Sequence, residues 1–199
     1  MKTTYSLLAL AVAAGLGFAP GMHAQTTKWT IDSNHSQADF QIRHMGVSTV
    51  RGSISGVKGT VELDEKDITK SKVDATLAAG TVNTGNDRRD ADLRSDNFFD
   101  VEKYPGISFT STGLVKQGDK LKLTGNLTLG AVTKPITLDV DGPAPAQKNP
   151  QNGKTISGFS ATGILKRSDF NFAPKPQYSA VLGDEVKFTI DVEIDKVEQ

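Results

Sequence analysis

The chain has 199 residues, and its 23 Lys and Arg balance 23 Asp and Glu, so the formal net charge is zero. This balance argues against nucleic-acid binding, which depends on neutralising phosphates, and against electrostatic docking on anionic lipid. The absence of Cys excludes disulfides, thiolate zinc sites and thiol nucleophiles.

Residues 1–24 have the features of a secretory signal peptide. Lys2 supplies a positive charge, and the apolar run over residues 7–18 is too short to span a bilayer as a stable helix. Ala24 precedes the expected cleavage site, although a cut after Ala19 is the alternative because Met22 is large for its position. We therefore expect export to the periplasm of a Gram-negative host, a single mature domain and no stable membrane insertion.

Alternating apolar and polar residues predict short β-strands in the first half of the mature domain, which covers residues 25–199. In the clearest example Phe40, Ile42 and His44 share one face of a strand over residues 38–44. The other predicted strands of this half are residues 29–31, 47–54, 59–63 and 73–77.

Residues 86–97 break this alternation and are strongly polar. Asn86 is a candidate N-cap, and Asp90 and Arg94 have the i,i+4 spacing of a helical ion pair. We expect one short helix that lies outside the barrel or across its end. Its charges indicate a solvated surface, and the alternative is a polar lid in which Arg89 and Asp90 meet a ligand headgroup.

Strand signals return after Pro105, and residues 121–129 give the longest clean alternation. Residues 142–153 are predicted to be a flexible loop and residues 167–183 to be irregular. Short antiparallel strands joined by hairpins favour an all-β, up-and-down barrel of about eight strands with one short helix, and a β-sandwich is the competing architecture. The remaining predicted strands are residues 107–111, 136–140, 156–165 and 186–194.

The sequence offers little for catalysis or for a metal. His35 and His44 are the histidines outside the signal segment, and two histidines without Cys do not form a zinc ligand set by themselves. Residues 158–163 miss the G-x-S-x-G pattern of a nucleophilic Ser by one position. We expect no catalytic residues, no metal and no cofactor.

Five motifs follow one another between Trp29 and Ile194. They are Trp29-x-Ile31-Asp32-x-x-His35-Ser36; Phe40-x-Ile42-x-His44-x-Gly46-x-Ser48-x-Val50-x-Gly52; Asn83-Thr84-Gly85-Asn86-x-x-Arg89-Asp90-x-x-Leu93-Arg94-Ser95-x-x-Phe98-Phe99-Asp100-Val101; Tyr104-Pro105-x-Ile107-x-Phe109-x-Ser111-Thr112; and Gly125-x-Leu127-Thr128-Leu129-Gly130-x-Val132-Thr133-Lys134-Pro135. In this order they resemble the YceI-like family of periplasmic, lipocalin-like, polyisoprenoid-binding proteins.

The resemblance implies an eight-stranded barrel with a helix beside it, which holds a long isoprenoid or a similar amphiphile without cofactor or established catalytic residue. Two positions depart from the family. Asp92 stands where a His is frequent, and Ile54 stands where an aromatic residue is common. Both departures affect the identity of the ligand more than the fold.

The inward strand faces predict the lining of the barrel. Gly52 and Gly125 are expected to leave room in it, and His44, Arg89 and Asp90 are the headgroup candidates. Burying one methylene contributes about 0.8 kcal/mol, whereas association costs roughly 4–15 kcal/mol, so the ligand needs a long tail. The residues expected to contact the ligand are Phe40, Ile42, His44, Val50, Arg89, Asp90, Phe98, Phe99, Phe109, Leu123, Leu127, Phe159 and Phe188.

The hypothesis is non-catalytic binding, transport or sequestration of a polyisoprenoid, an isoprenoid quinone or a similar amphiphilic lipid. A hydrolase or isomerase that uses His44 is one alternative, and a scaffold protein with a filled barrel is another. The sequence does not decide whether the protein forms a homodimer.

Overall fold

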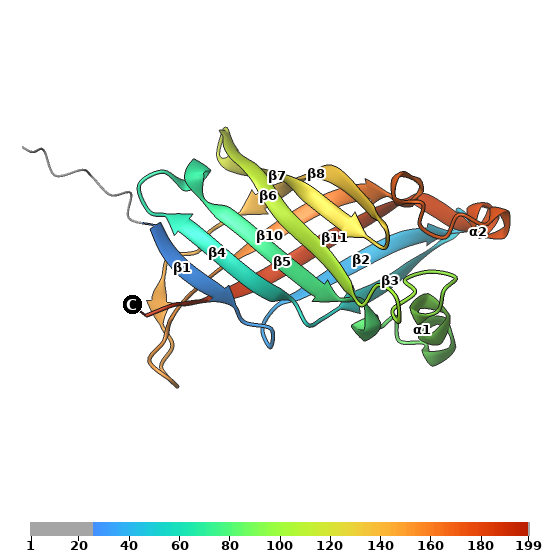
Figure 1. The fold of residues 1–199 in the computed structure, drawn as a ribbon, viewed down its shortest axis with the longest axis horizontal. Helices are drawn as coiled ribbons and strands as arrows, with labels where there is room; N and C mark the ends of the chain where they lie inside the picture. Colours follow the sequence, from blue (N-terminus) through green and yellow to red (C-terminus); the bar gives the residue numbers. More distant parts are fainter. Residues whose placement is uncertain (1–25, 199) are drawn as a thin grey trace, which may run out of the picture.

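The computed structural model describes residues 26–198, so the predicted signal peptide lies outside the described residues. Antiparallel strands form most of the structure (Figure 1). Their side chains alternate between the interior and solvent, as in the strand over residues 120–129. The strands are β1 (Thr26–Ile31), β2 (Gln37–His44), β3 (Ser48–Ile54), β4 (Lys58–Asp64), β5 (Lys72–Ala78), β6 (Gly106–Gln117), β7 (Lys120–Leu129), β8 (Val132–Asp141), β9 (Gln147–Lys148), β10 (Thr155–Lys166) and β11 (Leu182–Lys196). The helices are α1 (Asp87–Arg94), α2 (Pro176–Val181) and the short 3-10 helices η1 (Ile68–Lys70), η2 (Ala79–Thr81) and η3 (Arg167–Phe170).

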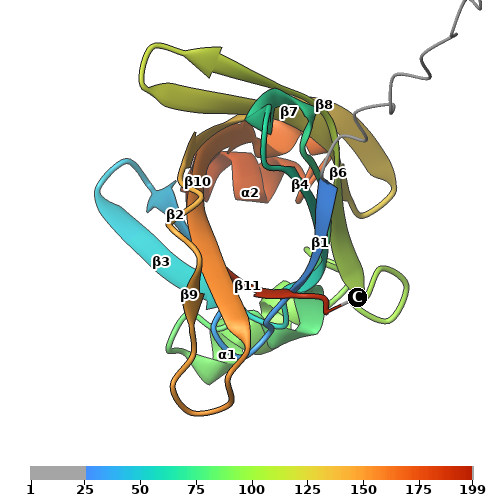
Figure 2. The ribbon, with the colours of Figure 1, turned by 90° about the vertical axis from the view of Figure 1, so that its left-hand side faces the viewer.

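The sheet closes on itself through β11. This strand pairs with β10 on one side and with β1 on the other, so β1, β4, β5, β6, β7, β8, β10 and β11 form a closed ring of eight strands. Figure 2 views this ring nearly end-on, with the β2–β3 hairpin at its side, where β2 pairs with β11 and the hairpin extends the wall of the barrel. The predicted eight-stranded barrel is therefore confirmed over the β-sandwich.

The β2–β3 hairpin is attached to the ring where β11 changes partner. β11 pairs with β2 from Leu182 to Asp191 and with β1 from Ile194 to Lys196. At the change, the buried Ser36 hydroxyl accepts a hydrogen bond from the Glu193 amide and donates one to its carbonyl. Ser36 thus satisfies the Glu193 amide, while the Glu193 carbonyl also accepts a hydrogen bond from the Asp32 amide at 2.9 Å.

Helix α1 forms where the polar segment predicted it, although it ends earlier than residue 97. The Asn86 side chain caps it by accepting a hydrogen bond from the Arg89 amide at 3.0 Å. The predicted pairing of Asp90 with Arg94 is wrong. Arg94 instead donates to the carbonyls of Gly80 and Val82, each at 2.8 Å, and so fastens the helix to the segment after β5.

The two ends of the barrel differ. Near the chain termini, the buried side chains of Trp29, Val61 and Ile194 pack together and fill the interior. At the opposite end lie α1, α2 and the tip of the β2–β3 hairpin (Figure 1). Among residues 26–198, no helix combines the length and the apolar character that crossing a membrane requires.

Candidate functional site

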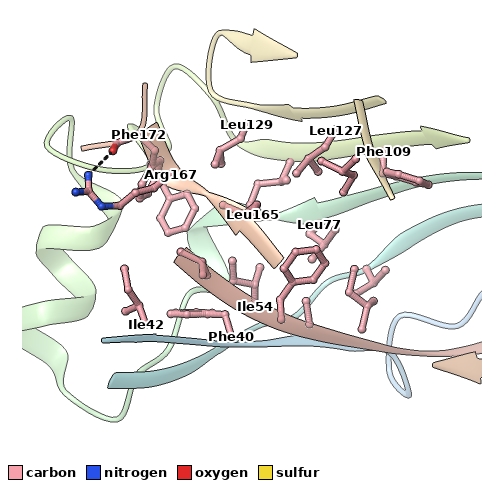
Figure 3. Close-up of a pocket in the computed structure, with 18 of the residues that line it drawn as sticks. Phe40, Ile42, Ile54, Leu77, Phe109, Leu127, Leu129, Leu165, Arg167 and Phe172 are labelled. Carbon is pink, nitrogen blue, oxygen red and sulfur yellow. Dashed lines mark hydrogen bonds between the residues drawn. The ribbon is translucent and has the colours of Figure 1, made fainter. Parts of the chain in front are cut away.

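A cavity of about 440 Å³ runs inside the barrel. This volume falls within the range typical of small-molecule sites. Figure 3 shows Phe40 and Ile42 on one side of it, facing Leu129 across the interior. All residues of the lining are apolar except His44, Ser48, Arg89, Asp92 and Arg167.

The structure places nearly all predicted site residues on this lining, because residues two apart on a strand share a face. Asp90 is the exception. The predicted residues found on the lining are Phe40, Ile42, His44 and Val50 from the β2–β3 hairpin, Arg89 from α1, Phe98 and Phe99 from the segment after it, and Phe109, Leu123, Leu127, Phe159 and Phe188 from the barrel wall.

Asp90 lies beneath α1 and away from the cavity. Its side chain is only 4% exposed, and its carboxylate accepts hydrogen bonds from the amide and the hydroxyl of Thr84. Arg89 also donates to Thr84, at 2.7 Å to the hydroxyl and 3.0 Å to the carbonyl. Arg89 and Asp90 therefore fix the start of α1 to the preceding loop. The prediction that Asp90 faces the cavity and contacts a headgroup is wrong.

The glycines of the wall hold aromatic rings and do not leave open space. A Cβ atom built on Gly52 would lie 2.6 Å from Cζ of Phe40, and one on Gly125 would overlap the ring of Phe109. The space that these glycines provide is therefore occupied by the rings of Phe40 and Phe109. Because each ring lies over a glycine of the adjoining strand, it follows the wall and leaves the middle of the barrel open.

Arg167 is a lining residue that the sequence did not indicate. Only 5% of it is exposed, and its guanidinium donates to the carbonyls of Gly183, Phe172 and Ala173 at 3.0–3.1 Å (Figure 3). None of the ion pairs found among residues 26–198 includes it. Arg167 thus holds the irregular segment before α2 against the start of β11 and brings a positive charge to the cavity.

Leu182, Phe172 and Leu129 also line the cavity without having been predicted. Leu129 is the last residue of the predicted alternation over residues 121–129 and shares a face with Leu127, so this pattern could have identified it. Phe172 lies outside the strands and has no periodic signal, and a register shift between Leu182 and Val186 interrupts the alternation of β11 before it reaches Leu182.

The polar lining residues gather at the end that carries the helices. His44 and Ser48 flank the tip of the β2–β3 hairpin, Arg89 and Asp92 lie on α1, and Arg167 begins η3. His44 is half-buried and Ser48, Arg89 and Asp92 are exposed, whereas lining residues deep in the barrel are buried. The mouth of the cavity therefore has a polar rim.

Aromatic side chains cover part of this mouth. The Phe98 ring lies 4.7 Å from that of Tyr178, and the Phe99 ring lies 4.9 Å from that of Phe172, measured between centroids. These contacts join the segment after α1 to the segment that contains α2. Apolar surface therefore continues outward from the barrel to the rim.

One cluster of potential metal ligands lies on the outer face of the wall. Nδ1 of His35 lies 2.8 Å from Oδ2 of Asp32 and 3.7 Å from Oε1 of Glu193. The Asp32 carboxylate raises the pKa of His35, and its hydrogen bond with His35 lowers the pKa of Asp32. These groups could contribute three ligands to a cation, and their contacts also hold the β1–β2 turn against β11.

Comparison with known proteins agrees with this architecture. A protein named YceI from Salmonella arizonae is 40% identical over 160 residues, which cover 79% of this chain and 82% of that protein. The solved Campylobacter jejuni YCEI protein is 35% identical, with a TM-score of 0.68 over 79% of this chain and 91% of that one. A polyisoprenoid-binding domain from Saccharophagus degradans shares the fold, with a TM-score of 0.62 at 14% identity over 85% of this chain and 98% of that domain.

The family comparison covers nearly the whole described barrel. The YceI-like domain matches residues 29–194, which extend from β1 into β11. The matched span includes every strand that forms the cavity and both helices at its mouth. The chain therefore belongs to the YceI-like domain family.

Proposed function

We propose that this protein binds a long-chain apolar molecule inside its barrel, and that it carries or sequesters this molecule without changing it covalently. The supporting observation is the cavity of about 440 Å³, whose lining is apolar except for five residues at one end. The fold shared with a polyisoprenoid-binding domain also supports the proposal. Its predicted signal peptide is consistent with action in the periplasm.

The lining favours a ligand with a long tail. About twelve buried methylene groups would contribute roughly 10 kcal/mol, at about 0.8 kcal/mol each. Association itself costs roughly 4–15 kcal/mol, so a short acyl group would bind weakly or not at all. A polyisoprenoid, an isoprenoid quinone or a similar amphiphile meets this requirement.

The rim supplies polar partners for a headgroup. Arg89 and Arg167 are donors, and His44 offers a ring nitrogen. Asp92, which stands where the family often has a histidine, is an acceptor whose carboxylate already receives a hydrogen bond from the side-chain amide of Asn97 at 3.0 Å. We infer that the headgroup lies among these side chains while the tail extends into the barrel.

The catalytic alternative lacks an arrangement that would activate His44. A general base is normally oriented by a neighbouring carboxylate or hydroxyl within hydrogen-bond reach. In the described part of the chain, no side-chain hydrogen bond joins His44 to such a group. Incubation with candidate lipids tests this alternative, since a product that disappears in His44→Ala would establish catalysis.

The direct test is extraction of the native ligand. Gently purified protein is extracted with organic solvent and analysed by mass spectrometry, and added isoprenoids are then scored by the shift in melting temperature. We expect a long-chain lipid in the extract and a positive shift. Several preparations without lipid and without any shift would refute the proposal.

A cavity-filling variant locates the binding. Ala161 is buried on the lining, and Thr162 beside it is exposed on the outer face. Ala161→Phe should weaken lipid binding by about tenfold or more because its ring occupies the space of the tail, whereas Thr162→Phe should bind like the wild type. Ala75→Leu fills the same space from β5 if Ala161→Phe does not fold, and unchanged binding in a folded filling variant would contradict the assignment.

A further inference from the structure

The tip of the β2–β3 hairpin presents apolar side chains to solvent. The tip consists of Met45, Gly46 and Val47, and Met45 is 62% and Val47 84% exposed. It lies next to α2 at the mouth end of the barrel (Figure 1). The Met45 amide donates to the Val181 carbonyl at 2.7 Å, so the tip is held in place.

The left-handed backbone conformation of the tip is unfavourable for Met45. Met45 and Gly46 have φ angles of 50° and 69°, and the Val47 amide donates to the His44 carbonyl at 3.0 Å. Hairpin turns with two left-handed residues favour Asn, Asp or Gly, because other side chains are strained in this conformation. Neither the turn nor the packing of the barrel favours Met at position 45. A strained, exposed apolar residue of this kind points to a role outside the chain.

The tip borders the mouth of the cavity. His44 precedes the tip and Ser48 follows it, and both line the cavity. Leu182, another lining residue, pairs with His44 across the strands. Whatever surface covers Met45 and Val47 therefore lies next to the entrance.

The hairpin segment that carries the tip is positively charged, although the whole chain is neutral. Residues 41–51 contain Arg43 and Arg51 and no Asp or Glu. The Arg43 guanidinium donates to the Gly46 carbonyl and to the Thr49 hydroxyl, so its charge is held at the tip. Apolar side chains beside cationic ones are typical of segments that insert into the interface of an anionic bilayer.

We propose that this tip docks on the surface of an anionic phospholipid bilayer and thereby brings the cavity mouth against the membrane. The inference rests on the proposed function, because a long-tailed lipid that leaves a bilayer directly into the mouth avoids exposure of its tail to water. The two exposed side chains insert, and the arginines contact the headgroups. The contact is small, which suits reversible docking.

The test uses Met45→Asn combined with Val47→Thr. Asn is favoured at the left-handed position, so this variant should be at least as stable as the wild type. We expect about tenfold less co-sedimentation with empty vesicles of phosphatidylethanolamine and phosphatidylglycerol. The transfer rate of a dansyl-labelled long-chain fatty acid from these vesicles should fall by a similar factor.

The control is Val115→Thr, which removes an exposed apolar side chain from β6 near the opposite end of the barrel. This control should co-sediment and transfer like the wild type, and all three proteins should bind the dansyl probe equally in vesicle-free buffer. Equal co-sedimentation of the tip variant and the wild type would overturn the docking proposal. So would a tip-dependent dimer in light scattering without vesicle binding, because the tip would then contact a second copy.

Different measurements would refute the lipid-binding function and the docking of the tip on a bilayer. If the wild type binds no probe in buffer and yields no native lipid, the proposed function is refuted. Co-sedimentation with empty vesicles needs no ligand and still decides whether the tip docks.

Discussion

Substituting Gly52 tests how the barrel keeps its interior open. A Cβ atom at this position would lie 2.6 Å from Cζ of Phe40 and 2.8 Å from the carbonyl oxygen of Asn83. The Phe40 ring could rotate away, but the Asn83 carbonyl belongs to the backbone bridge between residues 53 and 83 and cannot move freely. Gly52→Ala therefore forces either the ring into the cavity or the loop away from β3.

The expected effect is a loss of stability. Overpacking of this kind destabilises by roughly 1–3 kcal/mol, while replacing a strand glycine by alanine stabilises by about 0.5–1 kcal/mol. The net free energy of unfolding should fall by about 1–2 kcal/mol, which lowers the melting temperature by roughly 2–8 °C for a domain of this size. Lipid binding should also weaken, because the displaced Phe40 ring occupies the space of the tail.

Urea unfolding and differential scanning calorimetry measure this effect against a matched control. A Cβ atom added to Gly113, in β6, would meet no other atom within 4 Å, and the backbone at Gly113 is not left-handed. Gly113→Ala should be neutral or slightly stabilising. Phe40→Leu in the Gly52→Ala background should recover part of the loss. Equal stabilities of Gly52→Ala and Gly113→Ala would refute the account of the glycines.

Three further predictions concern the polar contacts. Arg167→Met should lower the free energy of unfolding by about 2–4 kcal/mol, because three carbonyls lose their donor, and a urea midpoint equal to that of the wild type would contradict this. Asn86→Ala should cost about 1 kcal/mol through loss of the N-cap of α1, while Asn86→Asp should retain most of the stability in the same assay. His35→Gln tests the ion pair with Asp32. Because the pKa of His35 is raised in the folded state, the ion pair contributes fully to stability below pH 6.5, and this contribution is lost as the pH rises through the folded-state pKa. Because the pKa of Asp32 is lowered, the contribution persists on the acid side until the pH falls below 3.8. The wild type should therefore melt above His35→Gln at about pH 5.5 and match it at about pH 8.5, and a difference independent of pH would exclude the ion pair as its cause.

Alternation along single strands predicted the all-β class and most of the lining, whereas the choice of a barrel over a β-sandwich rested on the closure of strand edges and on the family resemblance. Phe40, Ile42 and His44 occupy one face of β2 whatever strand lies beside them. The cap at Asn86 was also predictable, since it involves residues three apart. Local periodicity therefore determined the class of fold and the apolar character of the interior.

The features that could not be predicted depend on partners distant in sequence. Gly52 gives no sign that the Phe40 ring lies over it, because the strand register decides that contact. Arg167 precedes a segment without periodicity, and one of its carbonyl partners, Gly183, becomes a neighbour only after β11 pairs with β10. Asp90 was predicted to contact the headgroup, but the sequence does not show which face of α1 is turned toward the barrel. The hydrogen bonds from Thr84, in the preceding loop, hold Asp90 beneath the helix and away from the cavity.

The position of β11 has a consequence for the order of assembly. Its fifteen residues follow the other described strands in the sequence, and they pair with β1, β2 and β10. A growing polypeptide can pair β4 through β8 as successive antiparallel neighbours, but the ring cannot close until β11 has been made. Such non-local closure is slow. The ring should therefore stay open until β11 has been synthesised and has paired with both β1 and β10.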